Sequence, residues 1–200
     1  MGHFLSVVLI NVAVELEGRD FAVGQSGLSE VPRGGWNFVW KQKLPGKVNV
    51  FAWRLCKVAL PTGINVRQRR ILQHSLYPRC SWEEETAKHT MVECDFARQT
   101  SALTNLLWHT TGTWGDLAES WLRHLHKQLE AWEYRFALVI AWKLWNSRNH
   151  VLMENDHQTP FEVVDFCRRF IHSFEAAVLP RLTVGDSMGA IDIGCGFVLS

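Results

Sequence analysis

The longest apolar stretch of the sequence, residues 130–155, constrains the fold more than any other segment. It reads EAWEYRFALVIAWKLWNSRNHVLMEN, and its middle is apolar nearly all the way round a helix. Such a helix has to be covered by other elements on most of its surface. Its charge-free run, residues 136–142, is far too short to span a bilayer. We therefore expect 130–155 to be the longest helix and the centre of the C-terminal half, with no membrane association.

Apolar residues recur at helical spacing in most of the chain, which predicts a mainly α fold. Further helices are expected at 36–43, 47–59, 64–73, 86–94 in its first part, 97–108, 116–129 and 160–178. The core-facing stripe of 47–59 is Val48, Phe51, Ala52, Leu55 and Val58, with Cys56 as a small core residue. The apolar residues of 97–108 include Ala97, Leu103, Leu106 and Leu107, and those of 160–178 include Phe161, Val164, Phe166, Phe170, Ile171 and Phe174. Thr62 is expected to cap a helix, and Pro180 to stop the last one.

The run from residue 36 to residue 80 contains no Asp or Glu, although the whole chain has a net charge of only +1. Its basic residues are Lys41, Lys43, Lys47, Arg54, Lys57, Arg67, Arg69, Arg70 and Arg79. Because one side of each helix faces the core, we expect these residues to collect on one surface near Tyr77. Such a surface is either a solvated helix face or a patch that meets nucleic-acid phosphates.

Five cysteines at irregular spacing exclude a disulfide framework and favour a reducing intracellular compartment, the nucleus or the cytoplasm. Cys80, His89 and Cys94 follow the basic run and are candidate metal ligands. Zinc prefers four nitrogen or sulfur ligands in a tetrahedron. Residues five apart on an α-helix are about 140° out of phase, so a helix has to end between His89 and Cys94 if both bind one ion.

These residues stand in an order that resembles a known family. The order is W-x3-W-K-x-K-L-P-x-K-V, F-A-W-R-L, A-L-P-T, a basic helix, P-R-C, E-E-E-T-A-K-H and C-D-F-A-R. It resembles the zinc-binding domain that follows reverse transcriptase in plant non-LTR (LINE-type) retrotransposons. The family pattern of Cys-x-x-Cys, His and Cys implies zinc on Cys80, His89 and Cys94, with Tyr77 at the position of the first cysteine. A phenol is a poor zinc ligand because its pKa is about 10, so zinc binding is expected to be weak or absent.

Two later segments resemble further parts of the same retrotransposons. The run W-K-L-W-N-S-R-N-H at 142–150 resembles the segment that follows the zinc-binding domain, and 186–200 resembles the opening strands of an RNase H domain. The resemblance implies an N-terminal segment 1–35, a zinc-binding-like domain 36–108, a helical hairpin-like linker 116–180 and a short β-like tail 186–200. RNase H chemistry needs several carboxylates around two metal ions, whereas the tail offers only Asp186 and Asp192. No catalytic residue is expected.

The sequence therefore predicts a small, irregular helical domain with a zinc loop, and a chain that is not an enzyme. As a fragment of a retrotransposon polyprotein it is expected to bind RNA or DNA and no small-molecule substrate. The expected phosphate contacts are Lys41, Lys43, Lys47, Arg67, Arg69, Arg70 and Arg79. The alternative is a structural or protein-interaction remnant of a decayed element, with no role in nucleic-acid binding.

Overall fold

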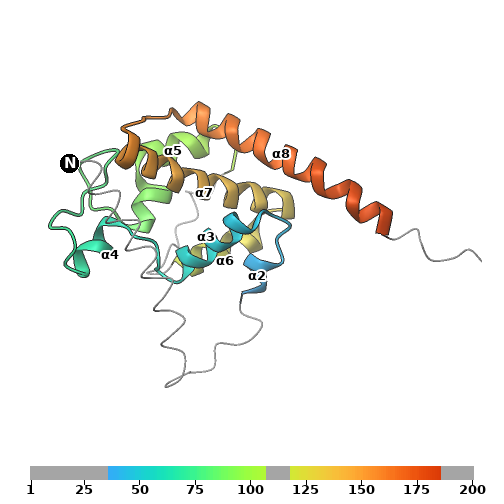
Figure 1. Cartoon of the computed structure of the whole chain (residues 1–200), viewed down its shortest axis with the longest axis horizontal. Helices are drawn as coiled ribbons and strands as arrows, with labels where there is room; N and C mark the ends of the chain where they lie inside the picture. Colours follow the sequence, from blue (N-terminus) through green and yellow to red (C-terminus); the bar gives the residue numbers. More distant parts are fainter. Residues whose placement is uncertain (1–35, 107–117, 186–200) are drawn as a thin grey trace, which may run out of the picture.

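The computed structural model describes residues 36–106 and 118–185, with side chains placed as far as residue 178, and it is mainly helical (Figure 1). In chain order the elements are α2 (Asn37–Trp40), α3 (Gly46–Cys56), α4 (Gly63–Gln68), the π-helical turn η1 (His89–Glu93), α5 (Asp95–Ala102), α6 (Ala118–Gln128), α7 (Ala131–Glu154) and α8 (Pro160–Gly185). Within these two ranges there is no strand, and an isolated antiparallel bridge pairs Leu76 with Glu84. The predicted mainly α fold is confirmed, whereas segments 1–35 and 186–200 lie outside the described residues.

Helix α7 lies at the centre of the molecule and contacts α3, α6, α8 and η1. Its N-terminus has a capping box, in which the side chains of Glu130 and Glu133 each accept the backbone N–H of the other residue. Consecutive residues from Leu138 to Ala141 are all buried. Because consecutive residues point to different sides of a helix, this burial means that α7 is covered all the way round, as its sequence predicts.

Helices α7 and α8 form an antiparallel hairpin along one side of the body (Figure 1). Two expectations about this hairpin are wrong. Helix α8 has 26 residues and α7 has 24, so α7 is not the longest helix. Helix α8 also continues through Pro180 to Gly185, because a proline removes one backbone hydrogen bond and can bend a helix without ending it.

In the first turn of α8, the apolar residue Phe161 is 67% exposed. The buried residues that follow it in α8 are Val163, Val164 and Cys167. Phe161 lies two residues before Val163, a spacing that places the two side chains on opposite sides of a helix. Phe161 therefore lies on the solvent side of α8.

One hydrophobic core joins the segment before residue 107 to the α7–α8 hairpin, so the core crosses the predicted division between 36–108 and 116–180. The stripe on α3 is buried as expected at Val48, Phe51, Ala52 and Leu55, and Cys56 is a buried core residue. Val58 was wrongly assigned to this stripe. Helix α3 ends at Cys56, and Val58 has a φ of 54° and is 52% exposed.

Helices α4 and α5 are shorter than predicted. Helix α4 begins as expected, with Thr62 accepting a hydrogen bond from the Asn65 N–H, but it ends at Gln68, and Arg70 has a φ of 59°. Helix α5 ends at Ala102, and Leu103 is 44% exposed and not part of the core. Apolar spacing alone did not reveal these ends, since the local turn that breaks each helix leaves the apolar pattern intact.

Candidate metal centre

The three predicted ligands converge on one point. The ligand atoms of Cys80, His89 and Cys94 all lie within 4.8 Å of one another, and Cys80 Sγ is 3.3 Å from His89 Nε2. Cys80 comes from the loop after α4, His89 begins η1, and Cys94 follows η1 directly. The side chains of His89 and Cys94 are buried, and that of Cys80 is half-buried.

The π-helical turn explains how His89 and Cys94 meet. The Cys94 N–H donates to the His89 carbonyl, five residues back, at 2.9 Å. This wider turn brings Cys94 round closer to His89 than an α-helix would. Cys94 then has a φ of −61° and a ψ of 141°, which ends the turn and starts α5. The expectation that the helix ends between the two ligands is confirmed.

The loop that carries Cys80 is closed by its own backbone. The Ser81 N–H donates to the Tyr77 carbonyl at 2.8 Å, and the Tyr77 N–H donates to the Glu83 carbonyl at 2.8 Å. The bridge between Leu76 and Glu84 continues this pairing. Cys80 is therefore held at the tip of a tight loop, and Glu83 lies beside Tyr77 across it.

Tyr77 is part of the core next to the three ligands. Its side chain is fully buried, and its ring meets the His89 ring edge-on with centroids 5.3 Å apart. Its hydroxyl has no hydrogen-bond partner among the described residues. Burial raises the pKa of the Tyr77 phenol further above its ordinary value of 10. The phenol therefore stays protonated at neutral pH and is no substitute for a cysteine thiolate.

The geometry and chemistry of Cys80, His89 and Cys94 fit zinc. With Zn–S of about 2.3 Å and Zn–N of about 2.0–2.1 Å, ligand atoms in a tetrahedron lie about 3.5–3.8 Å apart, so only small movements are needed. Burial lowers the pKa of His89, although the carboxylates of Glu93 and Glu83 act in the opposite direction. The lowered pKa favours the neutral imidazole, whose lone pair can bind a metal. Burial raises the pKa of the Cys94 thiol, so a bound metal has to displace its proton.

All three ligand residues line an open cleft of about 590 Å³. The other lining residues are Trp82, Glu83, Glu93, Asp95 and Arg98. Two of the three carboxylates have cationic partners: Glu93 pairs with Lys88 at 2.8 Å, and Asp95 pairs with Arg98 at 2.5 Å. Tyr77 is not among the lining residues, so the solvent-facing side of the metal site is the side away from it.

A buried ion pair behind the metal loop was missed from the sequence. The guanidinium of Arg148 on α7 donates through Nε and Nη2 to the carboxylate of Glu85, and Nη2 lies 2.6 Å from Oε2. The Gly63 N–H also donates to this carboxylate, at 2.6 Å. Glu85 is 1% exposed and Arg148 is 3% exposed. The sequence signal for this ion pair was Arg148 itself, a charged residue within a helix that is apolar on most sides.

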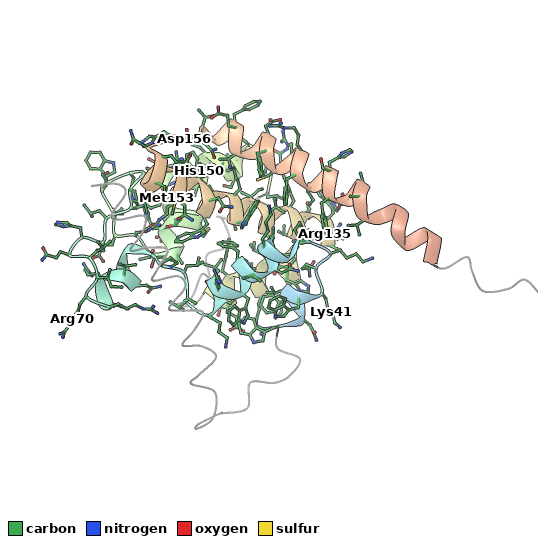
Figure 2. The ribbon with its side chains drawn as sticks, viewed as in Figure 1. Lys41, Arg70, Arg135, His150, Met153 and Asp156 are labelled. Atoms are coloured by element: carbon green, nitrogen blue, oxygen red, sulfur yellow. The ribbon has the colours of Figure 1, made fainter. Side chains whose placement is uncertain are left out.

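The predicted phosphate contacts are spread over the length of the body (Figure 2), which corrects the expectation that they collect in one patch near Tyr77. Lys41, beside α2, and Arg70, beyond α4, lie far apart on either side of the helical body (Figure 2). Arg67, Arg69 and Arg70 are exposed together at α4. Lys41 and Lys43 are exposed at the other end.

Two of the predicted contacts, Arg79 and Lys47, are already engaged by residues of the C-terminal half. Arg79 donates to the Ser147 hydroxyl at 2.7 Å and to the Gln158 carbonyl at 2.9 Å, and its guanidinium lies 3.5 Å from the centre of the Phe96 ring. The Lys47 ammonium lies over the rings of Trp142 and Phe170, at 4.7 Å and 5.0 Å. Both side chains help to attach the first part of the chain to the α7–α8 hairpin.

Comparison with known proteins gave one finding. Residues 26–100 match a family model described as zinc-binding in reverse transcriptase. This range is less than half of the chain and contains all three converging ligands together with Tyr77. Searches of curated proteins and of solved structures gave no match. Among the described residues, no helix is both long enough and apolar enough to cross a membrane.

Proposed function

We propose that this chain is a non-catalytic segment of a reverse-transcriptase polyprotein, and that it binds RNA or DNA beside a weakened zinc site. The observation that carries the proposal is the convergence of Cys80, His89 and Cys94 within the range that matches the family model. The resemblance of the sequence to plant LINE-type elements, with an RNase H-like start at 186–200, supports the same origin. Such a polyprotein acts on nucleic acid in the nucleus or the cytoplasm.

The weakening of the zinc site follows from Tyr77. A buried, protonated phenol leaves the metal with three protein ligands of the family pattern. Tyr77→Cys should therefore raise zinc affinity sharply, because it restores the fourth thiolate or imidazole ligand of the family pattern. Tyr77→Phe, which removes only the unpartnered hydroxyl, is the matched control and should leave zinc affinity unchanged. Tight one-to-one zinc in the unmodified chain that resists a mild chelator would contradict the weakened site.

The basic residues at α4 are the best candidates for phosphate contacts. Arg69 and Arg70 are exposed at the end of α4, and the exposed Arg67 is held by Glu84 at 2.5 Å. A surface ion pair of this kind contributes little in water, so a phosphate can compete with Glu84 for the guanidinium. These contacts neutralise charge and read no base sequence, so little sequence preference is expected.

The test is the salt dependence of binding to single- and double-stranded nucleic acid. Replacing Arg67, Arg69 and Arg70 together by Gln should lower the slope of log affinity against log salt by about 2, at roughly 0.7–0.9 per lost contact. Replacing Lys41 and Lys43 by Gln at the other end of the body is the matched control and should change the slope less. The proposal fails if the unmodified chain does not bind at low salt, or if the triple variant keeps the original slope.

One observation favours the alternative, a protein-interaction module without nucleic-acid binding. Trp82 is 84% exposed at the mouth of the metal cleft, and Glu83, Glu93 and Asp95 line the same cleft. An exposed tryptophan beside carboxylates suits a protein partner better than a phosphate backbone, which the carboxylates repel. Absence of nucleic-acid binding at low salt would support this alternative.

A further inference from the structure

The metal site lacks a fourth protein ligand of the family pattern, and the cleft beside it contains carboxylates that can supply one. Zinc accepts Asp or Glu oxygen at about 2.0–2.2 Å, together with Cys and His. The cleft touches Cys80, His89 and Cys94 and is lined by Glu83, Glu93 and Asp95. A fourth ligand from this side would complete the sphere without any movement of the buried Tyr77.

The three carboxylates are not equivalent. Glu93 is held by Lys88 at 2.8 Å, and Asp95 is held by Arg98 at 2.5 Å. Within residues 36–106 and 118–178 the Glu83 side chain has no ion pair and no hydrogen bond, and it is exposed to the cleft. Glu83 can therefore turn to a metal without breaking an existing interaction, whereas Glu93 and Asp95 cannot.

The backbone of the loop also favours Glu83. Residues 80 and 83 have the Cys-x-x-ligand spacing that lets two side chains of one tight loop bind the same zinc ion. The 2.8 Å hydrogen bond from the Tyr77 N–H to the Glu83 carbonyl places Glu83 across the loop from the position where the family pattern has its first cysteine. Glu83 thus follows Cys80 by three residues, just as the position of the lost ligand precedes Cys80 by three residues.

We propose that Glu83 is the fourth ligand of a metal bound by Cys80, His89 and Cys94, through a carboxylate oxygen that faces the cleft. This inference rests on the zinc site of the proposed function and adds a ligand that the family pattern does not contain. The resulting set of two thiolates, one imidazole and one carboxylate carries one more negative charge than the metal can balance. An oxygen ligand open to solvent also exchanges more readily than a buried thiolate.

The experiment uses the full chain and two metal ions, Zn²⁺ and Co²⁺. Zinc affinity is measured by competition with a chromophoric chelator, and the visible spectrum of bound Co²⁺ reports the ligand set. Glu83→Gln should lower zinc affinity by at least about tenfold, since even the loss of a partner outside the ligand set costs about 10- to 100-fold. Glu83→Gln should also shift the Co²⁺ bands. Glu83→Cys should raise affinity and strengthen the thiolate bands.

Glu93→Gln is the matched control, because Glu93 lines the same cleft and has the same charge. It should leave the Co²⁺ spectrum unchanged. Equal losses of affinity from Glu83→Gln and Glu93→Gln, with identical spectra, would show a general effect of charge and overturn the inference. Zinc binding that is insensitive to Glu83 would overturn the inference and leave the weakened zinc site of the proposed function standing. No metal binding at all in the unmodified chain would remove both the inference and the zinc site of the proposed function.

Discussion

Replacing Arg148 by Met tests whether the buried ion pair behind the metal loop holds the two parts of the chain together. Methionine keeps most of the length and the apolar stem of the arginine side chain but removes the guanidinium. The Glu85 carboxylate then stays buried with the Gly63 N–H as its remaining donor. Because the change leaves the core packing of α7 nearly intact, its effect reports on the charge.

The size of the effect follows from the contacts that are lost. Arg148 donates two hydrogen bonds to Glu85 and a longer one, at 3.3 Å, to the Pro61 carbonyl. A hydrogen bond to a charged group contributes about 1.5–3 kcal/mol, and removing one partner of a buried ion pair costs about 3–5 kcal/mol. Since the free energy of unfolding of a domain is about 5–15 kcal/mol, Arg148→Met should remove a large part of it.

Urea unfolding followed by circular dichroism measures the loss. With a slope of about 2 kcal/mol per molar urea, a loss of about 3–5 kcal/mol lowers the midpoint by about 1.5–2.5 M. Arg169→Met is the matched control, because Arg169 pairs with Asp165 on the exposed side of α8 and should contribute about 0.5 kcal/mol. A double variant, Glu85→Gln with Arg148→Met, should recover part of the loss. Equal midpoints for Arg148→Met and Arg169→Met would refute the reasoning.

Two further predictions concern glycines and thiols. Gly63→Ala should lower the free energy of unfolding by about 1–3 kcal/mol, because its new Cβ would lie 2.7 Å from a backbone oxygen of the facing loop. Gly46→Ala, with nothing within 4 Å, should raise it by about 0.4–1 kcal/mol, and equal effects in urea unfolding would contradict the packing at Gly63. An alkylating agent at pH 8 should modify Cys80 long before Cys56 and Cys167, because burial raises the pKa of both to about 12 and keeps the reactive thiolate scarce until higher pH. Mass mapping that finds Cys56 modified as fast as in the unfolded chain would show the core to be open.

Most of the fold could be predicted because apolar spacing records which side of a helix is buried. The stripe on α3 and the all-round burial of α7 are both direct readings of that spacing. Helix ends were less predictable. Val58 and Arg70 have positive φ values, and neither valine nor arginine usually adopts such a conformation, so the residue types gave no sign of a helix end. The passage of α8 through Pro180 had no sequence signal either, since a proline alone does not distinguish an end from a bend.

The convergence of Cys80, His89 and Cys94 could be predicted because the resemblance places all three residues in one zinc-binding pattern. The residues that hold the loop in place, such as Ser147 and Arg148, could not be predicted. Arg79 was counted as a phosphate contact from its charge, although its guanidinium bonds to Ser147 and Gln158. Whether a charged side chain faces solvent or a partner depends on residues far away in the sequence. The pairing of Glu85 with Arg148, 63 residues later, shows the same limit.

The dependence of the metal loop on α7 has a consequence for the order of events during synthesis. Glu85 forms its ion pair with Arg148, and Arg79 forms its hydrogen bond with Ser147, which lies 68 residues later in the chain. At about 5–20 residues per second, α7 is completed several seconds after the loop has been made. During that interval the Cys80 and Cys94 thiols emerge without the helix that positions their loop. The loop therefore gains its contacts with Ser147 and Arg148 only after α7 has been made and has docked.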